Sequence, residues 1–163
     1  KAAERLTLGF QEVSRCVSAP AGHEYHACDN SMGQRTAFVR ESWQLIKQAP
    51  LLGNGAGSFW YGDQKTGYSV HNPHNEYLLA TVQTGLAELV LFLGWMACYF
   101  RAARYQTPAC RALFIALLGS YLACHLFNSF LLDSSEGHLF VILAGILAAG
   151  VVKHHLPLTD GAD

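Results

Sequence analysis

The hydrophobic and polar positions divide the chain into two parts. Residues 1–75 mix charged, polar and apolar side chains, whereas residues 86–152 carry few charges. Long apolar stretches with few charges are typical of helices inside a lipid bilayer. The pattern therefore predicts an all-α, polytopic membrane protein, with a polar region over residues 1–75, three transmembrane helices within 76–156 and a tail over 157–163.

Within the polar region, two helices are expected. One of them, the second in the chain, is predicted over Gln34–Gln48, where apolar residues recur at helical spacing. Pro50 is expected to end this helix. The Gly, Pro and Asn residues in 18–33 and 60–72 predict loops. The first helix is predicted over Ala2–Val17 by an apolar stripe that we expect to be packed against other elements, and its members are Leu6, Phe10, Val13 and Val17.

Two short features of this region bear on its chemistry. The glycine-rich run Gly53–Phe59 lacks the Lys-Ser/Thr ending of a phosphate loop, so it predicts a tight turn rather than a nucleotide site. Cys16 and Cys28 flank the first loop. They would form a disulfide in an oxidising compartment such as the periplasm and would stay thiols in the cytosol.

The predicted membrane spans also predict an orientation. The first span runs from Pro73 to Phe100, the second from Ala112 to about Leu132 and the third from His138 to about Val152. The loop between the first two holds three arginines, which places it in the cytoplasm by the bias of positive residues to that side. Residues 1–75 and a turn over 133–137 are therefore expected on the periplasmic side.

Polar residues within the predicted spans have two interpretations each. Glu88 lies in the first span, where an ionised carboxylate is costly, so it has either a functional or paired role or a place at the interface. His125, Asn128 and Ser129 share one face of the second predicted span. That face either bonds neighbouring helices or contributes to a site, and we favour the bonds between helices.

The border between the two parts carries the main catalytic candidate. Asn72 is a good N-cap and Pro73 suits a first helical position, so His74 is expected in the first turn of a helix. The positive end of the helix dipole there favours a neutral imidazole, which is a candidate general base. The alternative is a polar residue that only caps the helix.

Length and charge narrow the possibilities further. The chain has 163 residues and a formal net charge of −1, which gives no support to nucleic-acid binding. It opens with Lys1 and shows no signal peptide, so we expect a piece of a longer membrane protein.

Several runs carry a resemblance to a known family. His74-Asn75 is followed, after nine residues, by Gly85, and Arg35 is followed, after three residues, by Val39. With Gln34–Arg40 and Pro50–Phe59, these runs resemble the bacterial O-antigen ligase and polymerase family, and the ligases most closely. Val39 stands where the family has Leu. Glu88 also departs, because the family prefers a small residue or Tyr there.

The resemblance implies a fold and an activity. It implies a helical bundle like that of the C-type glycosyltransferases, with a helical periplasmic loop, in the bacterial inner membrane. It further implies an O-antigen ligase that transfers glycan from undecaprenyl diphosphate to the lipid A-core oligosaccharide, with inversion at the sugar carbon and with no metal and no nucleotide cofactor. The family's N-terminal transmembrane helices are absent from this chain, so it is expected to hold part of the site.

The chemistry of such a transfer assigns roles to named residues. A guanidinium offers paired donors to phosphate oxygens, so Arg35 is expected on the diphosphate. His74 is expected to activate the acceptor hydroxyl. Arg40 is the second choice for the diphosphate, because it lies on a different face of its helix from Arg35. Further substrate contacts are expected from Asn75 and His71.

Three alternatives share part of this interpretation. O-antigen polymerase and protein O-oligosaccharyltransferase use the same donor with other acceptors. The alternative from another class is a membrane protein that binds lipid-linked glycan without catalysis, for which Arg35 and His74 would be dispensable.

Overall fold

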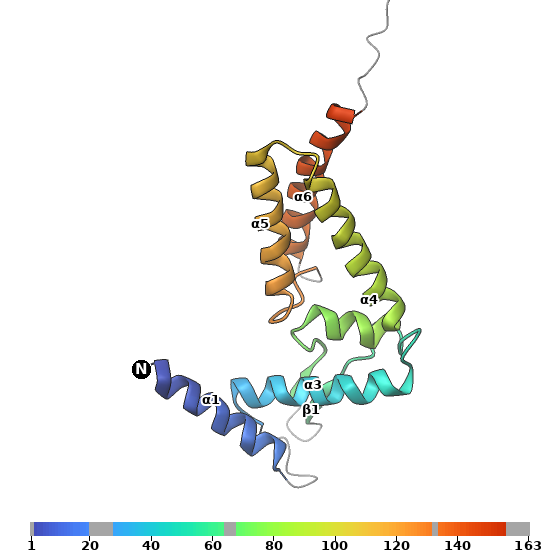
Figure 1. Ribbon diagram of the computed structural model, residues 1–163. Helices are drawn as coiled ribbons and strands as arrows, with labels where there is room; N and C mark the ends of the chain where they lie inside the picture. The colour runs from blue at the N-terminus through green and yellow to red at the C-terminus, as the bar shows by residue number, and fades with distance from the viewer. Residues whose placement is uncertain (1, 20–27, 64–67, 132–133, 156–163) are drawn as a thin grey trace, which may run out of the picture. The chain divides into compact units, whose positions relative to one another are not determined.

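The computed structural model describes residues 2–19, 28–63, 68–131 and 134–155, and this part of the chain is mostly helical, as predicted. Its contacts divide the chain into two compact units, Lys1–Glu88 and Leu89–Asp163. The elements, labelled in Figure 1, are α1 (Ala2–Val17), α3 (Ser31–Gln48), β1 (Tyr61–Asp63), β2 (Tyr68–Val70), α4 (Glu76–Ala103), α5 (Pro108–Cys124) and α6 (Ser134–His155). The tail predicted over 157–163 lies outside the described residues.

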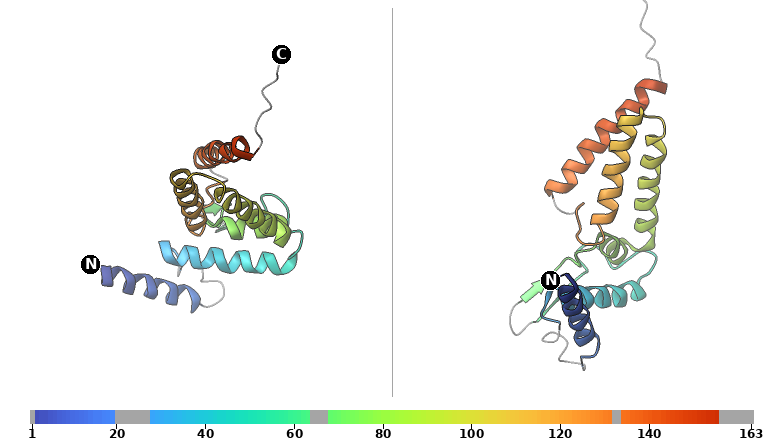
Figure 2. Two further views of the ribbon diagram at one scale, coloured as in Figure 1. Left: turned by 45° about the horizontal axis from the view of Figure 1, so that its top comes forward. Right: turned by 60° about the vertical axis from the view of Figure 1, so that its left-hand side comes forward.

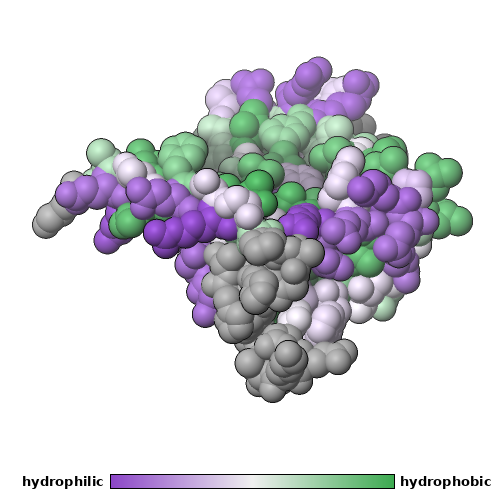
Figure 3. Space-filling view, turned by 90° about the horizontal axis from the view of Figure 1, so that it is seen from below, coloured by the Kyte–Doolittle hydropathy of each residue, from purple (hydrophilic) through white to green (hydrophobic). Residues whose placement is uncertain are grey.

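Helix α1 has the predicted bounds, but its apolar stripe is not packed as expected. Phe10 is 75% exposed, and Leu6 and Val17 are exposed as well. The helix contacts α3 instead through a neighbouring face that carries Gly9 and the buried Cys16. A glycine lets two helices approach closely, so this face packs better than the bulkier stripe. Figure 3 shows the result, a surface on which hydrophobic and hydrophilic side chains alternate along α1.

A disulfide fastens the end of α1 to the start of α3. Cys16 and Cys28 are bonded to each other, which decides between the two states that the sequence left open. Helix α3 begins three residues earlier than predicted, because Asn30 caps it: its side-chain oxygen accepts the N–H of Gly33 at 2.8 Å. Both cysteines are buried beside Ala37 of α3, so the bond belongs to the core of this unit.

A short β-hairpin stands where a loop was predicted. β1 and β2 pair antiparallel, with Tyr61 opposite Val70 and Gly62 opposite Ser69. Strands of three residues are too short for an alternating pattern to be recognised in the sequence. Residues 64–67, between the strands, lie outside the described part of the chain, as do residues 20–27 of the first predicted loop.

Helix α4 begins later than the predicted start at Pro73. Its N-cap is Asn75 rather than Asn72, because the Asn75 side-chain oxygen accepts the N–H of Leu78 at 3.0 Å. The side chain of Asn72 accepts the N–H of His74 at 2.8 Å instead. Both asparagines satisfy the residue preference for an N-cap, so the sequence alone does not choose between them.

Helix α4 is broken at Gly85, where the backbone has φ 81° and ψ −171°. The turn that follows α3 fills this break. It donates N–H groups to the last carbonyls before the break and accepts N–H groups from the first residues after it, which satisfies backbone groups that a helix end leaves without partners. The bonds are Asn54 N to Val82 O at 2.8 Å, Gly55 N to Gln83 O at 2.8 Å, Leu86 N to Pro50 O at 2.9 Å and Ala87 N to Leu51 O at 3.4 Å.

Two glycines allow the turn and the break to approach this closely. A Cβ on Gly85 would lie 2.3 Å from the carbonyl oxygen of Leu51, and a Cβ on Gly53 would lie 2.3 Å from the carbonyl oxygen of Gln83. Both glycines also have positive φ, which other residues rarely adopt. The glycine-rich run is therefore a turn, as predicted, and its role is to hold α4.

Phe38 is the centre of the hydrophobic core of the first unit. It is buried together with Ile46, Phe59 and Val82, which come from α3, the turn and the first half of α4. Its ring meets the ring of Phe59 edge-on, with centroids 6.0 Å apart, and that of Tyr61 at 5.2 Å. This cluster and the backbone bonds at Gly85 join α3 to the first half of α4.

The second unit contains the rest of α4 with α5 and α6, and the latter two lie side by side (Figure 2). Within the described residues, α4 is the one helix long and apolar enough to cross a membrane, while α5 and Ser135–Ala149 of α6 are shorter apolar helices. Three transmembrane helices thus stay a prediction. Many outward-facing side chains are apolar, as lipid contact requires, among them Leu91, Leu113, Ile142 and Ile146.

The second predicted span was wrong at its end. α5 stops at Cys124 and the chain then turns, so His125 caps the helix and Asn128 and Ser129 lie beyond it. The three polar residues therefore do not share a helix face. His125 is buried and its ring stacks on Phe92, with centroids 5.6 Å apart. The sequence did carry a signal for this turn, because Asn128 and Ser129 interrupt the apolar run and both residue types favour turns.

The bounds of the third predicted span and of the turn before it also differ. α6 begins at Ser134, inside the turn predicted over 133–137, and residue 133 lies outside the described residues. An acidic residue in the first turn, Glu136, suits a helix N-terminus. Its carbonyl accepts the hydroxyl of Tyr121 at 2.7 Å, which ties α6 to α5.

Substitution of Gly85 tests the break in α4. We expect Gly85→Ala to lower the free energy of unfolding by about 2 kcal/mol or more, because the new Cβ would collide with the backbone of Leu51 at a positive φ. Gly94→Ala is the matched control, since nothing lies within 4 Å of a Cβ there. Thermal unfolding of the purified full-length protein in detergent measures both. Equal stabilities of the two variants would contradict the account.

Substitution of Asn75 separates capping from a contact with substrate. Asn75→Ala is expected to cost about 1 kcal/mol of unfolding free energy, whereas Asn75→Ser, which keeps a side-chain acceptor, should cost little. If capping is the role, Asn75→Ser also keeps glycan transfer near the wild-type rate. A stable Asn75→Ser protein without transfer would assign the amide to the substrate.

Candidate functional site

The described residues place Arg35 and His74 in the lining of one small cavity. The cavity has a volume of about 200 Å³, and we call it the Arg35 cavity. It lies among α3, β2 and the segment that leads into α4. Its lining residues are Ser31, Gln34, Arg35, Phe38, Val70 and His74.

Helix α3 contributes four of the residues that line the cavity, and their spacing in the sequence places them on one side of the helix. Ser31, Gln34, Arg35 and Phe38 are spaced three and four apart, so they lie on one side of the helix. Phe38 is fixed in the core, and this fixes the turn of helix that carries Arg35. Ser31 and Gln34 were not predicted as site residues, although their spacing from Arg35 and Phe38 was a signal for them.

His74 is not in the first turn of α4, as was predicted. It lies just before the N-cap Asn75, in the left-handed region with φ 51°. Asn72 holds this conformation, because its side chain accepts the His74 N–H at 2.8 Å. The imidazole is exposed and its ring centroid lies 5.9 Å from that of Phe38. The same phenylalanine thus positions the residues on both sides of the cavity.

The spacing between His74-Asn75 and Gly85 has a structural explanation. Asn75 caps α4 and Gly85 breaks it, so residues 76–84 are one complete stretch of helix between two fixed points. The turn bonded at Gly85 follows directly on α3, which carries Arg35. Arg35 and His74 are therefore connected through α3, the turn bonded at Gly85 and the first half of α4.

The structure places the other predicted substrate contacts elsewhere. Arg40 lines a second, separate cavity, and Arg35 and Arg40 lie about 140° apart around α3, as the sequence predicted for different faces. The side chain of Asn75 caps α4, and His71 is exposed between β2 and Pro73. Among the described lining residues of the Arg35 cavity, none of these three appears. Their substrate contacts stay predictions.

Glu88 lies three residues after the break, half-buried at the end of the first unit. It is therefore close along the chain to the backbone bonds at Gly85 rather than deep in a long continuous helix. This position does not decide between the two interpretations of Glu88.

The Arg35 cavity contains functional groups that could bind a small anionic group and transfer a proton. A guanidinium can hold an anionic group through two parallel hydrogen bonds to two of its oxygens, and an imidazole can take up a proton. The volume suits one such group, and it is smaller than the pockets that enclose whole ligands of drug size. In the part of the chain that the structure describes, no three His, Cys, Asp or Glu side chains are grouped to hold a metal ion.

Comparison with known proteins identifies the family of the chain. The sequence profile of the O-antigen ligase family matches residues 5–93, which is more than half of the chain and includes every residue of the Arg35 cavity. No curated protein and no solved structure matches the chain. The family is one of membrane-associated enzymes with ligase- or polymerase-type glycan transfer. The matched region covers both the cavity and the elements that position it, and the chain therefore belongs to the O-antigen ligase family.

Proposed function

We propose that the protein is an O-antigen ligase, which transfers polysaccharide from undecaprenyl diphosphate to the lipid A-core oligosaccharide in the bacterial inner membrane. The observation that carries the proposal is the Arg35 cavity. It combines a cation and an imidazole from segments far apart in the sequence, within the region that matches the family. These are the two groups that the transfer needs.

Arg35 holds the diphosphate of the donor. When the bond between the sugar carbon and the diphosphate breaks, negative charge grows on the departing oxygen. A guanidinium beside that oxygen stabilises the charge without a metal, and its planar donors also orient the diphosphate. Gln34 and Ser31, on the same side of α3, add neutral polar groups around the anion.

His74 acts on the acceptor hydroxyl. Its imidazole takes the hydroxyl proton while the oxygen forms its bond to the sugar carbon. The carbon–oxygen bond to the diphosphate breaks at the same time, and undecaprenyl diphosphate leaves with the electron pair. Attack from the side opposite the diphosphate inverts the sugar carbon. The left-handed backbone at His74 fixes the start of its side chain for this role.

The disulfide supports the proposed location of the site. Disulfides persist in oxidising compartments such as the periplasm and are rare in the cytosol. The Cys16–Cys28 bond lies in the same unit as the Arg35 cavity. This agrees with residues 1–75 on the periplasmic side, where finished lipid-linked polymer and lipid A-core meet.

Lipopolysaccharide from cells with and without the full-length protein tests the proposed acceptor. We expect the deletion to remove long-chain lipopolysaccharide and to leave lipid-linked polymer unused, because the final transfer is missing. A gel of lipopolysaccharide and an assay of the lipid-linked pool measure this. Capping by single repeats would instead identify a polymerase. Normal lipopolysaccharide with an unglycosylated acceptor protein would identify an oligosaccharyltransferase.

Variants at the two site residues separate their roles. Arg35→Ala should weaken donor binding as well as transfer, and Arg35→Lys should rescue poorly, because an ammonium lacks the planar pair of donors. His74→Asn should leave donor binding nearly intact and lower the transfer rate by about a hundred- to ten-thousand-fold, as expected for loss of a general base. Asn tolerates the left-handed backbone at this position, so the variant should fold.

The assay measures donor binding and transfer rate on equal amounts of purified full-length enzyme. Arg15→Ala is the control for Arg35, since Arg15 is exposed at the end of α1 and outside the cavity lining. A stable His74→Asn enzyme that transfers near the wild-type rate would exclude the general-base role. Loss of donor affinity in His74→Asn as severe as in Arg35→Ala would move His74 to the diphosphate.

A further inference from the structure

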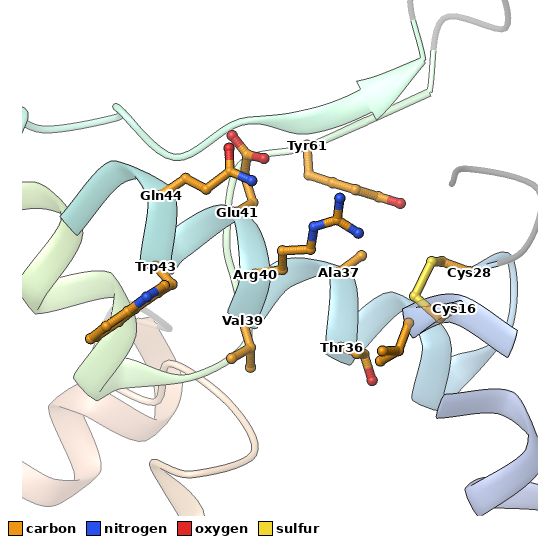
Figure 4. A pocket seen from close by; sticks show the side chains of 11 residues that line it. Cys16, Cys28, Thr36, Ala37, Val39, Arg40, Glu41, Trp43, Gln44 and Tyr61 are labelled. Atoms are coloured by element: carbon orange, nitrogen blue, oxygen red, sulfur yellow. A yellow bond between two sulfur atoms is a disulfide. The ribbon is translucent and has the colours of Figure 1, made fainter. Parts of the chain in front are cut away.

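A second, larger cavity lies on the other side of α3 from the Arg35 cavity. It has a volume of about 610 Å³, within the range of pockets that enclose organic ligands. Figure 4 shows it along α3, from the Cys16–Cys28 disulfide at one end to Trp43 at the other. We call it the Trp43 cavity. Its lining comes from the end of α1, from α3 and from Tyr61 of β1.

The lining combines aromatic rings with planar polar groups. Trp43 is 59% exposed, although a tryptophan on a surface normally buries its ring. Figure 4 shows the guanidinium of Arg40 beside the ring of Tyr61, with Glu41 and Gln44 further along the helix. A guanidinium, a carboxylate and an amide thus follow one another within little more than one turn of α3.

These groups match the two surfaces of a sugar ring. The faces of a pyranose carry slightly positive C–H groups, which contact the negative face of an indole or phenol ring. Its adjacent hydroxyls can each donate and accept, and so they pair with the two-pronged groups of Arg, Glu and Gln. Trp43 and Tyr61 provide the rings, and Arg40, Glu41 and Gln44 provide the polar groups.

Other ligand classes match the cavity less well. An anion such as phosphate would meet the carboxylate of Glu41 beside the single cation, Arg40, that the described lining contains. A lipid chain would cover the polar groups of Glu41 and Gln44 without giving them hydrogen-bond partners, which is costly. A neutral, hydroxyl-rich ring avoids both problems.

The cavity is also built on fixed elements. The disulfide and Ala37 form a buried cluster against which Tyr61 packs, so one aromatic wall is held in place. Phe38, the next residue, is in the core and fixes the rotation of α3. A site on elements that are already ordered loses less entropy on binding, which suits recognition of a flexible polysaccharide.

We infer that the Trp43 cavity is a saccharide-binding subsite, which holds sugar units of the donor polymer or of the acceptor core at a distance from the reacting carbon. The inference rests on the proposed function for the choice of glycans. Binding of sugar units away from the reaction lets an enzyme use that binding energy to orient the reacting end. Arg40 thereby contacts sugar hydroxyls, whereas Arg35, on the other side of α3, contacts the diphosphate.

Direct binding to purified full-length protein tests this subsite without requiring transfer. The probes are core oligosaccharide freed from lipid A by mild acid, and polymer released from undecaprenyl diphosphate in the same way. Titration calorimetry should show Trp43→Ala and Gln44→Ala weakening the binding of one probe by about three- to tenfold, the range expected for one aromatic contact. Trp43→Phe should keep most of the affinity, since a ring remains. The affected probe identifies the subsite as acceptor or donor.

Matched controls come from the same unit. Trp60→Ala removes another partly exposed tryptophan, 42% exposed, and Lys47→Ala removes another exposed side chain of α3, and both lie outside the described lining of the cavity. Both controls should bind like wild type. The inference is overturned if wild type binds neither probe at millimolar concentration, or if Trp43→Ala binds both like wild type. Saccharide binding that depends on Trp43 in a protein without transferase activity would refute the proposed function alone.

Discussion

The exchange of backbone hydrogen bonds between the turn after α3 and the break in α4 is the constraint on which the first unit depends. A helix that stops and restarts leaves carbonyls on one side and N–H groups on the other without partners. Here the turn supplies both kinds of partner, with Asn54 and Gly55 as donors and Pro50 as an acceptor. Since Gly53 and Gly85 admit no Cβ at this contact, the two segments meet in one register. Phe38 and its neighbours then fill the space between α3 and α4.

The position of the candidate site follows from that contact. α3 carries Arg35 and leads directly into the turn, while the first half of α4 ends at Gly85 and begins at the cap next to His74. Apart from the buried Phe38, the side chains that line the Arg35 cavity are exposed or half-buried and come from different segments, so they could not hold one another in place alone. The buried backbone contact between the turn after α3 and the break at Gly85 holds these segments in place. The glycines of this turn thus allow the close contact between the turn after α3, the helix that carries Arg35, and α4, the helix that follows His74.

The sequence predicted the parts of this arrangement that depend on local signals. It predicted both bounds of α1, most of α3 and the glycine turn, and it singled out Arg35 and His74, which are two of the six described residues that line the Arg35 cavity. It failed where two local signals compete or where the cause is distant. Asn72 and Asn75 are equally good caps, and the choice depends on which backbone N–H each can reach in the fold. The break at Gly85 needs a turn some thirty residues away, and the exposed stripe of α1 reflects packing through Gly9 and a disulfide. The roles of Arg35 and His74 stay proposals.

The geometry of the site depends on the number of residues in the short helix between Asn75 and Gly85. Each residue of an α-helix advances the chain by about 1.5 Å and rotates it by about 100°. One residue more or less within 76–84 would therefore turn His74 away from Arg35 even if every side chain in the cavity were unchanged. Substitutions that keep a helix are compatible with this geometry, whereas insertions and deletions are not. The length of this segment therefore sets the direction in which His74 points relative to Arg35. For the site, the number of residues in the segment matters more than the identity of most of them.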